Sequence, residues 1–581
     1  MVPFSLHPAA KEDPLEREVG GSLIPRDADP SMNAINPKTV WNRVLTCAGL
    51  TVLSSAPLLA LQTENSGGAL RPDQACFDVQ HYDLVLVVVP DSKKIGGSLT
   101  MTARMEKASE EISLDLDSRL TVRRVTVAGV EVEAIHTEGR ITIPLAKGQG
   151  APGQEIKVNV LYMGTPREAP NAPWVGGFTW AKTPSGADWV STTCQMEGAD
   201  LWWPCKDHPS DKPESFDLKV TVPAGLVCAS NGRLMGVQEG DSGARTFHWH
   251  TSMPIPNYSI ALNIAPYETI SRTVESIDGG AIPVTFWHLP ENTDKAKVLF
   301  EEIVDHLKHL ESVCGPYPFR QDKYGVVETP HLGMEHQTII AYGNNYSGDP
   351  EFDYDWLHHH EMSHEWWSNL LTCVDWADFW IHEGLGTYMQ ALYLESRFGV
   401  EAYRKKMEID WNRIGQNGAI APIAPRGTQS MYFAGGVPDA PGGDIYFKGS
   451  WVVHNLRWLM GDKEFFKLLR EWAKPGTGGA PRFVSTDQMI QVASSMARVD
   501  LDWYFDVVLK AKQMPVLTAE VKDGQLHLKW SVVGGKPYSM PVEVQLGSKR
   551  VRVECPAGEG TLAVGTQDWQ LDPDRWLIRQ R

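Results

Sequence analysis

A pair of histidines four residues apart, followed by a distant glutamate, constrains the fold more than any other feature of this chain. His360, Glu361 and His364 form the pattern H-E-x-x-H, and eighteen residues separate His364 from Glu383. Side chains four positions apart lie on one face of a helix, so the two histidines can bind one metal ion. Glu383 can complete the site from a following helix. The pattern therefore predicts two helices that meet around a metal centre.

The ligand types indicate zinc at a catalytic site. Two histidines and one carboxylate leave the fourth tetrahedral position to water, which is typical of catalytic rather than structural zinc. Glu361 would lie beside that water as a general base. A polar helix with solvated histidines is the alternative, but apolar and aromatic residues follow the motif at once, and buried histidines need partners. We predict one zinc ion per chain, bound by His360, His364 and Glu383.

The composition disfavours several classes of partner. The chain has 54 Lys and Arg against 72 Asp and Glu, a formal net charge of −18 at pH 7. No run of basic residues offers a compensating patch, so we expect no nucleic-acid partner and no anionic membrane surface. The eight cysteines show neither paired spacings nor a zinc pattern, which favours buried small side chains.

The N-terminal region has the pattern of an export signal. Residues 1–31 are polar, Met32 precedes two basic residues, and an apolar stretch fills residues 44–60. Basic residues before an apolar stretch of this length predict a signal peptide, and the stretch is short for a membrane span. We therefore expect residues 1–31 to be an upstream non-coding or disordered extension and residues 32–62 to be the signal. The mature protein would be exported, periplasmic or extracellular, with no stable membrane insertion. An uncleaved N-terminal anchor is the alternative.

Alternating apolar residues predict an N-terminal β domain over residues 63–272. Several segments alternate apolar with polar side chains, among them Ile112 to Leu116, Ile141 to Ile143, Ile156 to Val160 and Phe216 to Val222. Breaks rich in Gly and Pro separate these segments, as strand-connecting turns would. The pattern predicts an antiparallel sheet assembly.

The hydrophobic period changes to helical spacing near residue 292. Helical segments then dominate, which predicts a mainly helical domain over residues 273–513. Alternation returns in the last part of the chain, with a turn at Asp523-Gly524, and predicts a small β domain over residues 514–581. The predicted fold class is a multidomain α+β protein.

Six blocks of sequence, in a fixed order, carry a family resemblance. They are W-P-C-K-D-H-P-S at 203–210, G-P-Y-P-F at 315–319, L-G-M-E-H-Q-T at 332–338, H-H-E-M-S-H-E-W-W-S-N at 359–369, W-I-H-E-G-L-G-T-Y at 380–388 and Y-F-K-G at 446–449. Together they resemble the aminopeptidase N and leukotriene hydrolase family of zinc metallopeptidases, from about Tyr82 to the end of the chain. The resemblance implies an N-terminal antiparallel β domain, a thermolysin-like, mainly helical catalytic domain and a small C-terminal β-sandwich. It also leads us to expect a short form without the family's C-terminal helical domain.

The resemblance implies roles for three further residues. Tyr446 matches the tyrosine that hydrogen-bonds the oxyanion of the tetrahedral intermediate. Glu335 matches the glutamate that binds the α-ammonium group of the substrate. Gln195 falls where relatives of aminopeptidase N carry a second amine-binding glutamate, and a glutamine there resembles the leukotriene hydrolase branch. The pattern departs beside Glu335, where Leu332 and His336 replace the usual Gly and Asn.

The implied function is a zinc-dependent aminopeptidase that removes N-terminal residues from peptides with a free N-terminus. Two alternatives remain: a zinc hydrolase of another substrate, such as an epoxide, and a non-catalytic scaffold that kept the fold. Further departures at His382, Leu385 and Gly386 lie next to Glu383 but leave the ligand set intact. The sequence indicates neither the oligomeric state nor the preferred N-terminal residue.

Overall fold

The computed structural model describes residues 66–432 and 439–580. All the described residues belong to one compact unit. The expected extension 1–31 and signal peptide 32–62 lie outside the described residues. Within the described ranges, no helix combines the length and the apolar character that crossing a membrane requires. The exact domain limits stay predictions.

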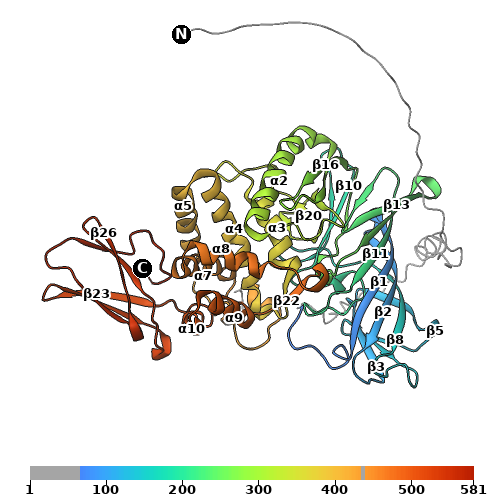
Figure 1. Cartoon of the computed structure of the whole chain (residues 1–581). Helices are drawn as coiled ribbons and strands as arrows, with labels where there is room; N and C mark the ends of the chain where they lie inside the picture. The colour runs from blue at the N-terminus through green and yellow to red at the C-terminus, as the bar shows by residue number, and fades with distance from the viewer. Residues whose placement is uncertain (1–65, 433–438, 581) are drawn as a thin grey trace, which may run out of the picture. The chain divides into compact units, whose positions relative to one another are not determined.

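Three sheets form the N-terminal β-rich part (Figure 1). The largest has the order β13-β14-β11-β1-β2-β8-β4-β5. Its strands are β1 Phe77–Val89, β2 Lys94–Met105, β4 Leu120–Val127, β5 Val130–Glu131, β8 Glu155–Gly164, β11 Ser215–Val222, β13 Arg233–Glu239 and β14 Arg245–Thr251. Neighbouring strands are antiparallel, as predicted, except that β1 and β11 run parallel. A long connection separates these two strands in the sequence, so the chain can return to the same edge before it forms β11.

The two smaller sheets of this part have the orders β12-β15-β10-β9 and β3-β7-β6. Their strands are β3 Glu111–Asp115, β6 Ile135–Thr137, β7 Arg140–Pro144, β9 Gly177–Lys182, β10 Asp188–Thr193, β12 Val227–Ala229 and β15 Asn263–Ala265. The end of β10 leads directly into the segment that carries Gln195. The predicted β domain is thereby confirmed in its type.

A mixed five-stranded sheet and a group of helices form the next part. The sheet has the order β16-β17-β18-β20-β19, with β17, β18 and β20 parallel. Its strands are β16 Glu268–Glu275, β17 Ala281–His288, β18 Tyr324–Glu328, β19 Gly333–Met334 and β20 Ile340–Tyr342. A small pair, β21 Leu371–Cys373 and β22 Arg482–Val484, lies elsewhere in this part. Strand β19 ends directly before Glu335 and contacts helix α3 (Trp356–His364), so this sheet positions Glu335 next to the helices.

The helices of this part are α2 Thr293–Cys314, α3 Trp356–His364, α4 Trp380–Phe398, α5 Val400–Trp411, α6 Gln429–Tyr432, α7 Asp444–Met460, α8 Asp462–Trp472, α9 Thr486–Ala497 and α10 Asp502–Val508. The helix predicted after residue 292 is α2, which ends where Gly315 adopts a φ of 106°. Only glycine enters that backbone region at no steric cost. The predicted mainly helical character is confirmed.

Two three-stranded sheets, β23-β24-β27 and β26-β25-β28, form the predicted small C-terminal β-sandwich. Their strands are β23 Val516–Lys522, β24 Gln525–Ser531, β25 Val542–Leu546, β26 Lys549–Val553, β27 Glu559–Ala563 and β28 Trp569–Leu571. Asp523 and Gly524 join β23 to β24 with φ angles of 50° and 72°. Positive φ at both central residues is the requirement of a type I′ hairpin, so this predicted turn is confirmed.

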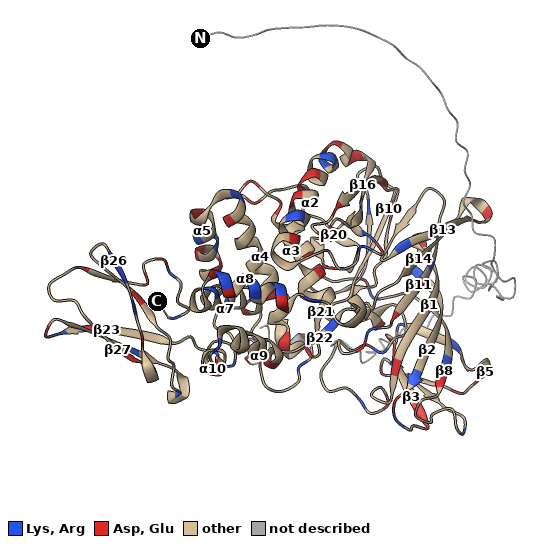
Figure 2. Cartoon of the chain, viewed as in Figure 1, with Lys and Arg blue, Asp and Glu red and all other residues tan. Residues whose placement is uncertain are grey.

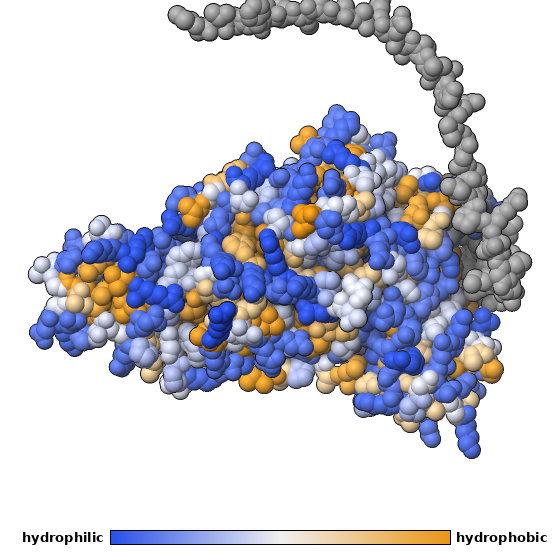
Figure 3. Space-filling view, viewed as in Figure 1, coloured by the Kyte–Doolittle hydropathy of each residue, from blue (hydrophilic) through white to orange (hydrophobic). Residues whose placement is uncertain are grey.

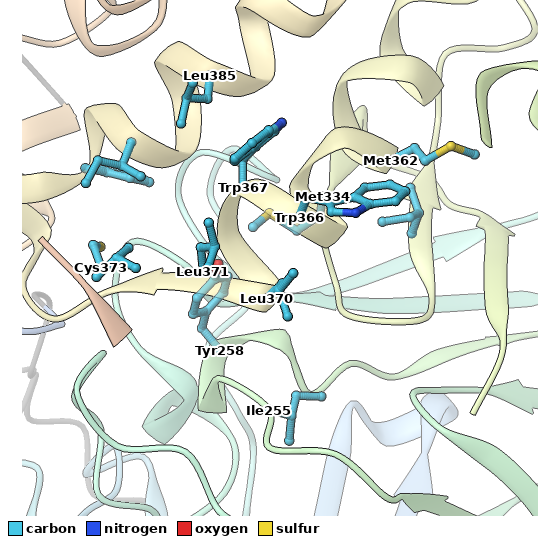
Figure 4. Packing of buried hydrophobic residues seen from close by; sticks show 14 of the residues in the cluster. Ile255, Tyr258, Met334, Met362, Trp366, Trp367, Leu370, Leu371, Cys373 and Leu385 are labelled. Carbon is cyan, nitrogen blue, oxygen red and sulfur yellow. The ribbon is translucent and has the colours of Figure 1, made fainter. Parts of the chain in front are cut away.

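The motif helix rests on a core that it shares with the N-terminal β-rich part. Figure 4 shows Tyr258 from that part among the side chains that surround Trp366 and Trp367. Both tryptophans are at most 1% exposed and belong to this core. A polar bond crosses the same boundary, from Lys212 Nζ to the carbonyl oxygen of Asn369 at 2.9 Å. Buried packing and a hydrogen bond from the N-terminal β-rich part therefore support the segment that follows the motif.

The surface follows from the composition. Figure 2 shows acidic and basic side chains interspersed along surface helices such as α2 and α5. Hydrophilic residues cover most of the face in Figure 3, and the apolar patches between them are small. All seven cysteines in the described ranges are buried and free, as their spacings predicted.

Candidate metal centre and substrate cleft

Helix α3 carries the H-E-x-x-H motif into the interior. The side chain of Asp355 caps its first turn by accepting a hydrogen bond from the backbone N–H of His358 at 2.9 Å. Such a cap satisfies a helix-terminal donor that has no partner inside the helix. A π-helical turn, Glu365–Leu370, follows the motif directly. Turns of this kind are frequent at functional sites because they redirect the chain within one helical path.

His360, His364 and Glu383 converge on one point. The two histidine Nε2 atoms lie 3.2 Å apart, and each lies 3.5 Å from Oε2 of Glu383. Oε2 is buried and has no hydrogen-bond partner among the described residues. A buried carboxylate oxygen that faces two imidazole nitrogens without a bond to either fits a cation at the common point. These three residues are also the set among the described residues whose ligand atoms can hold a metal ion.

The charges of these groups are interdependent. Burial disfavours the ionised form of Glu383, but the adjacent His364 and His360 outweigh it and hold the pKa of the carboxyl well below its ordinary value. Burial lowers the pKa of His360, whereas the nearby carboxylates overcome burial and raise the pKa of His364 to about 9. The carboxylates thus favour a positive charge at this point, and a bound divalent cation would take the place of the proton on His364.

A backbone contact between two helices sets the position of Glu383. A Cβ atom built on Gly384 of α4 would lie 2.9 Å from Cα of Gly449 in α7, and one on Gly449 would lie 2.8 Å from Cα of Gly384. No side chain fits there, so the helices approach to backbone contact. Glu383 precedes Gly384, and Tyr446 lies one turn before Gly449. The contact thereby fixes the distance between the third ligand and the tyrosine.

Glu361 lies beside the point where His360, His364 and Glu383 converge, and strand β19 packs closely against its side chain. Its side chain is only 7% exposed, and a Cβ on Gly333 of β19 would lie 2.5 Å from its Oε1. Burial raises the pKa of Glu361 well above its ordinary value; His364 opposes this, and Glu335 and Glu383 add to it. A raised pKa is typical of carboxylates that accept and return protons.

Glu335 and Gln195 meet although 140 residues separate them. The Gln195 Nε2 donates to Oε1 of Glu335, and the Tyr258 hydroxyl donates to the same oxygen at 3.0 Å. Tyr258 is itself held by Ser368 of the π-helical turn, with 2.8 Å between the hydroxyl oxygens. No hydrogen bond from a described residue reaches Oε2 of Glu335, which is therefore left for a ligand. Burial raises the pKa of this carboxyl to about 7.

Tyr446 lies against the metal ligands, with its ring stacked on His360 at a centroid distance of 6.0 Å. Its hydroxyl donates to the hydroxyl of Tyr432 at 2.9 Å, and burial raises the pKa of Tyr446 well above its ordinary value. Tyr446 is therefore a proton donor at neutral pH. Sequence reasoning missed Tyr432 and Tyr258, because neither is in the metal-binding or substrate-binding motifs.

His382, one of the departures noted in the sequence, has a structural role here. Its Nε2 accepts a hydrogen bond from the backbone N–H of Cys373 at 2.9 Å, and burial lowers the pKa of the ring to about 3. The ring is therefore neutral, and it ties α4 to β21 directly beside Glu383. This bond supports the orientation of the third ligand.

The predicted residues open onto one cleft of about 530 Å³. All seven of them line it: Gln195, Glu335, His360, Glu361, His364, Glu383 and Tyr446. The structure thus brings together every site residue expected from the sequence. Phe447 of the Y-F-K-G block also lines the cleft, as do Trp174, Lys406 and Arg413, which lie outside the motif blocks. The volume lies within the range of ligand-binding clefts in proteins.

Two family models match this chain: the Peptidase M1 N-terminal domain over residues 78–259 and the Peptidase family M1 domain over residues 316–501. Leukotriene A-4 hydrolase of Xenopus laevis is 25% identical over 424 residues, which are 67% of this chain and 64% of that protein. Leucine aminopeptidase 2 of Emericella nidulans is 25% identical over 411 residues, 65% of this chain and 61% of that protein. The chain thus spans just under two thirds of the length of these relatives.

A solved structure shares the fold. A variant of an M1 zinc metallopeptidase from Deinococcus radiodurans, bound to a Tyr-Ser-Ala substrate, superposes with a TM-score of 0.62 at 23% identity. The match covers 75% of this chain and 95% of that one. The β-rich part followed by a helical catalytic part is therefore the common arrangement.

Proposed function

Since this chain belongs to peptidase family M1, as its two domain matches show, we propose that it is a zinc-dependent aminopeptidase. The observation that carries the proposal is the single cleft that joins a two-histidine, one-carboxylate cluster to a buried carboxylate, Glu335. The first group suits hydrolysis of an amide, and the second suits recognition of a free amine.

Zinc held by His360, His364 and Glu383, one ion per chain, would polarise the substrate carbonyl and acidify the attacking water. Glu361 takes a proton from that water and passes it to the leaving amine. Because burial raises the pKa of Glu361, its carboxylate can both accept the proton and hold it until the transfer to the amine. The Tyr446 hydroxyl turns from Tyr432 to donate to the developing oxyanion.

Glu335 selects the first peptide bond. Its Oε1 is occupied by Gln195 and Tyr258, and its Oε2 pairs with the α-ammonium group of the substrate. Charge-assisted hydrogen bonds of this kind are about twice as strong as neutral ones. A peptide held by its amine then places only its first amide at the metal centre.

One comparison tests this function. The values of kcat/KM are measured for one peptide with a free amine and for its N-acetylated form, with the zinc-loaded wild type and with Glu335→Ala. We expect the acetylated peptide to be slower by roughly 10²-fold, since it leaves Glu335 unpaired. Glu335→Ala should reduce the ratio between the two kcat/KM values, because it lowers kcat/KM for the peptide with the free amine. Equal rates on both forms by the wild type would identify an endopeptidase.

We also propose that the protein is exported. The support is the basic and apolar pattern after Met32, which lies outside the described residues. Expression from Met32 in the native host should give a mature N-terminus between about residues 61 and 69. N-terminal sequencing of the protein that the native host makes from its own gene tests the start, and protein that still carries residues 1–31 would contradict the proposal.

A further inference from the structure

Residues 66–68, which we call the N-terminal strap, connect two segments that line the cleft. The backbone N–H of Ser66 donates to the carbonyl oxygen of Met196 at 3.4 Å, and the carbonyl oxygen of Ser66 accepts from the backbone N–H of Thr428 at 3.1 Å. The Thr428 hydroxyl donates to the same oxygen of Met196. Met196 lines the cleft, and Thr428 directly precedes α6, whose last residue, Tyr432, lines it too. The strap therefore holds the two segments together.

Gly67 of the strap packs directly on an indole ring. It forms an antiparallel bridge with Gly427, and its φ is 81°. A Cβ atom on Gly67 would overlap Cδ1 of Trp376 and lie 2.7 Å from its Nε1. Only glycine suits this position, because both the backbone region and the close approach exclude a side chain. The carbonyl oxygen of Gly68 accepts a hydrogen bond from Nε2 of His208 at 2.8 Å. Every residue of the strap thus has a specific partner.

The strap lies behind both side chains that donate to Glu335. Met196 directly follows Gln195, whose Nε2 donates to Oε1 of Glu335. The ring of Trp376 packs against the ring of Tyr258 at a centroid distance of 5.7 Å, and the Tyr258 hydroxyl donates to the same Oε1 at 3.0 Å. One residue separates the strap from the first donor, and one ring separates it from the second.

The position of these donors matters because the carboxylate of Glu335 is buried. A buried carboxylate that loses a donor must shift toward another partner, and its second oxygen moves with it. Oε2 of Glu335 therefore has a fixed direction only while Gln195 and Tyr258 hold Oε1. Trp376 also lies against the ring of His382, but the bond that orients that ring comes from the backbone of Cys373.

We propose that residues 66–68 are positioning residues for the substrate amine: by holding Met196 and Trp376, they direct the free oxygen of Glu335 toward the α-ammonium group. The inference rests on the proposed function, which assigns Glu335 to that group. A loosened strap should weaken recognition of a free N-terminus. It should leave zinc binding and turnover at saturating substrate nearly unchanged, because the metal ligands and Glu361 come from α3 and α4.

The test substitution is Gly67→Ala, which forces the strap away from Trp376. Its control is Gly129→Ala, in the turn between β4 and β5. Gly129 has the same φ of 81°, but a Cβ there meets nothing within 4 Å, so this control carries the backbone strain alone. Each zinc-loaded full-length protein is assayed for kcat and KM with one free-amine peptide, and for kcat/KM with the N-acetylated form of that peptide.

We expect Gly67→Ala to raise KM for the free-amine peptide roughly tenfold, with kcat changed by less than about twofold. The ratio of kcat/KM between the free and acetylated peptides should fall by a similar factor, because the acetylated form makes no bond to Oε2. Gly129→Ala should match the wild type in KM and in this ratio. Zinc content and thermal unfolding are measured on every variant.

A second pair of variants tests the strap without adding a side chain against Trp376. Ser66→Pro removes the N–H that donates to Met196, whereas Ser66→Ala keeps it, and both lose the hydroxyl. Ser66→Pro should raise KM for the free-amine peptide roughly threefold relative to Ser66→Ala. This pair decides the matter if Gly67→Ala does not fold.

Unchanged KM and an unchanged free-to-acetylated ratio in Gly67→Ala and Ser66→Pro would overturn the positioning role. A lower kcat with KM and the ratio unchanged would also overturn it, because that is the signature of a smaller folded fraction. Loss of zinc from either variant would assign the strap to the metal cluster instead. Equal rates of the wild type on free and acetylated peptides would remove the proposed function, and this role with it, so the two failures are distinguishable.

Discussion

The contact between Gly384 and Gly449 predicts a large functional effect from one added methyl group. In Gly449→Ala, the new Cβ would lie 2.8 Å from Cα of Gly384, whereas ordinary contacts begin at 3.4 Å. Because the obstacle is backbone, the helices must separate by about 0.6 Å. Overpacking of this kind costs about 1–3 kcal/mol of folding free energy.

The separation moves Glu383 away from Tyr446, since each lies within one turn of its glycine. Misplacements of about 1 Å in a reacting geometry cost roughly 10²-fold in rate, so a shift of about half that size should cost roughly tenfold. We expect kcat/KM on an aminoacyl-nitroanilide to fall roughly tenfold, with zinc still bound. The assay pairs turnover with zinc content measured by mass spectrometry and with thermal unfolding.

Gly236→Ala is the control. A Cβ at Gly236 meets nothing within 4 Å, so the same chemical change carries no packing cost. Its activity and unfolding temperature should match the wild type. Wild-type kcat/KM in Gly449→Ala would refute the argument that the two-glycine contact positions the catalytic groups.

Further substitutions test single roles. Glu361→Gln should keep its zinc, by metal analysis, and lose roughly 10²-fold or more in turnover, since an amide takes no proton. Tyr446→Phe should lower kcat by roughly 10²-fold with little change in KM; a raised KM at constant kcat would mean a ground-state contact. Tyr258→Phe removes a donor that lowers the pKa of Glu335, about 7 with that donor present. The acidic limb of the kcat/KM profile should therefore move to higher pH, and KM should rise about threefold; an unmoved limb would exclude this role for Tyr258.

The cluster that could hold a metal ion was found from the sequence because helical spacing alone brings His360 next to His364. The roles of Glu335 and Tyr446 could be predicted only from the family resemblance, because neither residue lies in a local pattern that indicates its chemistry. Neither route reveals Tyr258, because its bond to Glu335 joins segments 77 residues apart in sequence. Such contacts depend on how the β-rich part packs against the helices.

The same limit applies to the fold. Alternating apolar residues predicted several strands, among them β3, β7, β8 and β11, and an antiparallel sheet assembly, because the pattern is local. The parallel pairing of β1 with β11 was not predicted, since it depends on where a long connection returns. The contact of the Arg413 guanidinium with the ring of Phe447 was not predicted either, because an isolated arginine in a sequence does not indicate which side chain it contacts.

The hydrogen bond between Gln195 and Glu335 has a consequence for how changes elsewhere in the chain affect the site. All three metal ligands come from two consecutive helices, whereas the completed anchor for the substrate amine needs a side chain made 140 residues earlier. The candidate metal cluster is therefore contributed locally in the sequence, whereas the contacts of Glu335 depend on the docking of the β-rich part. A change that loosens this docking should disturb the contacts of Glu335 directly and the candidate metal cluster only through the shared core.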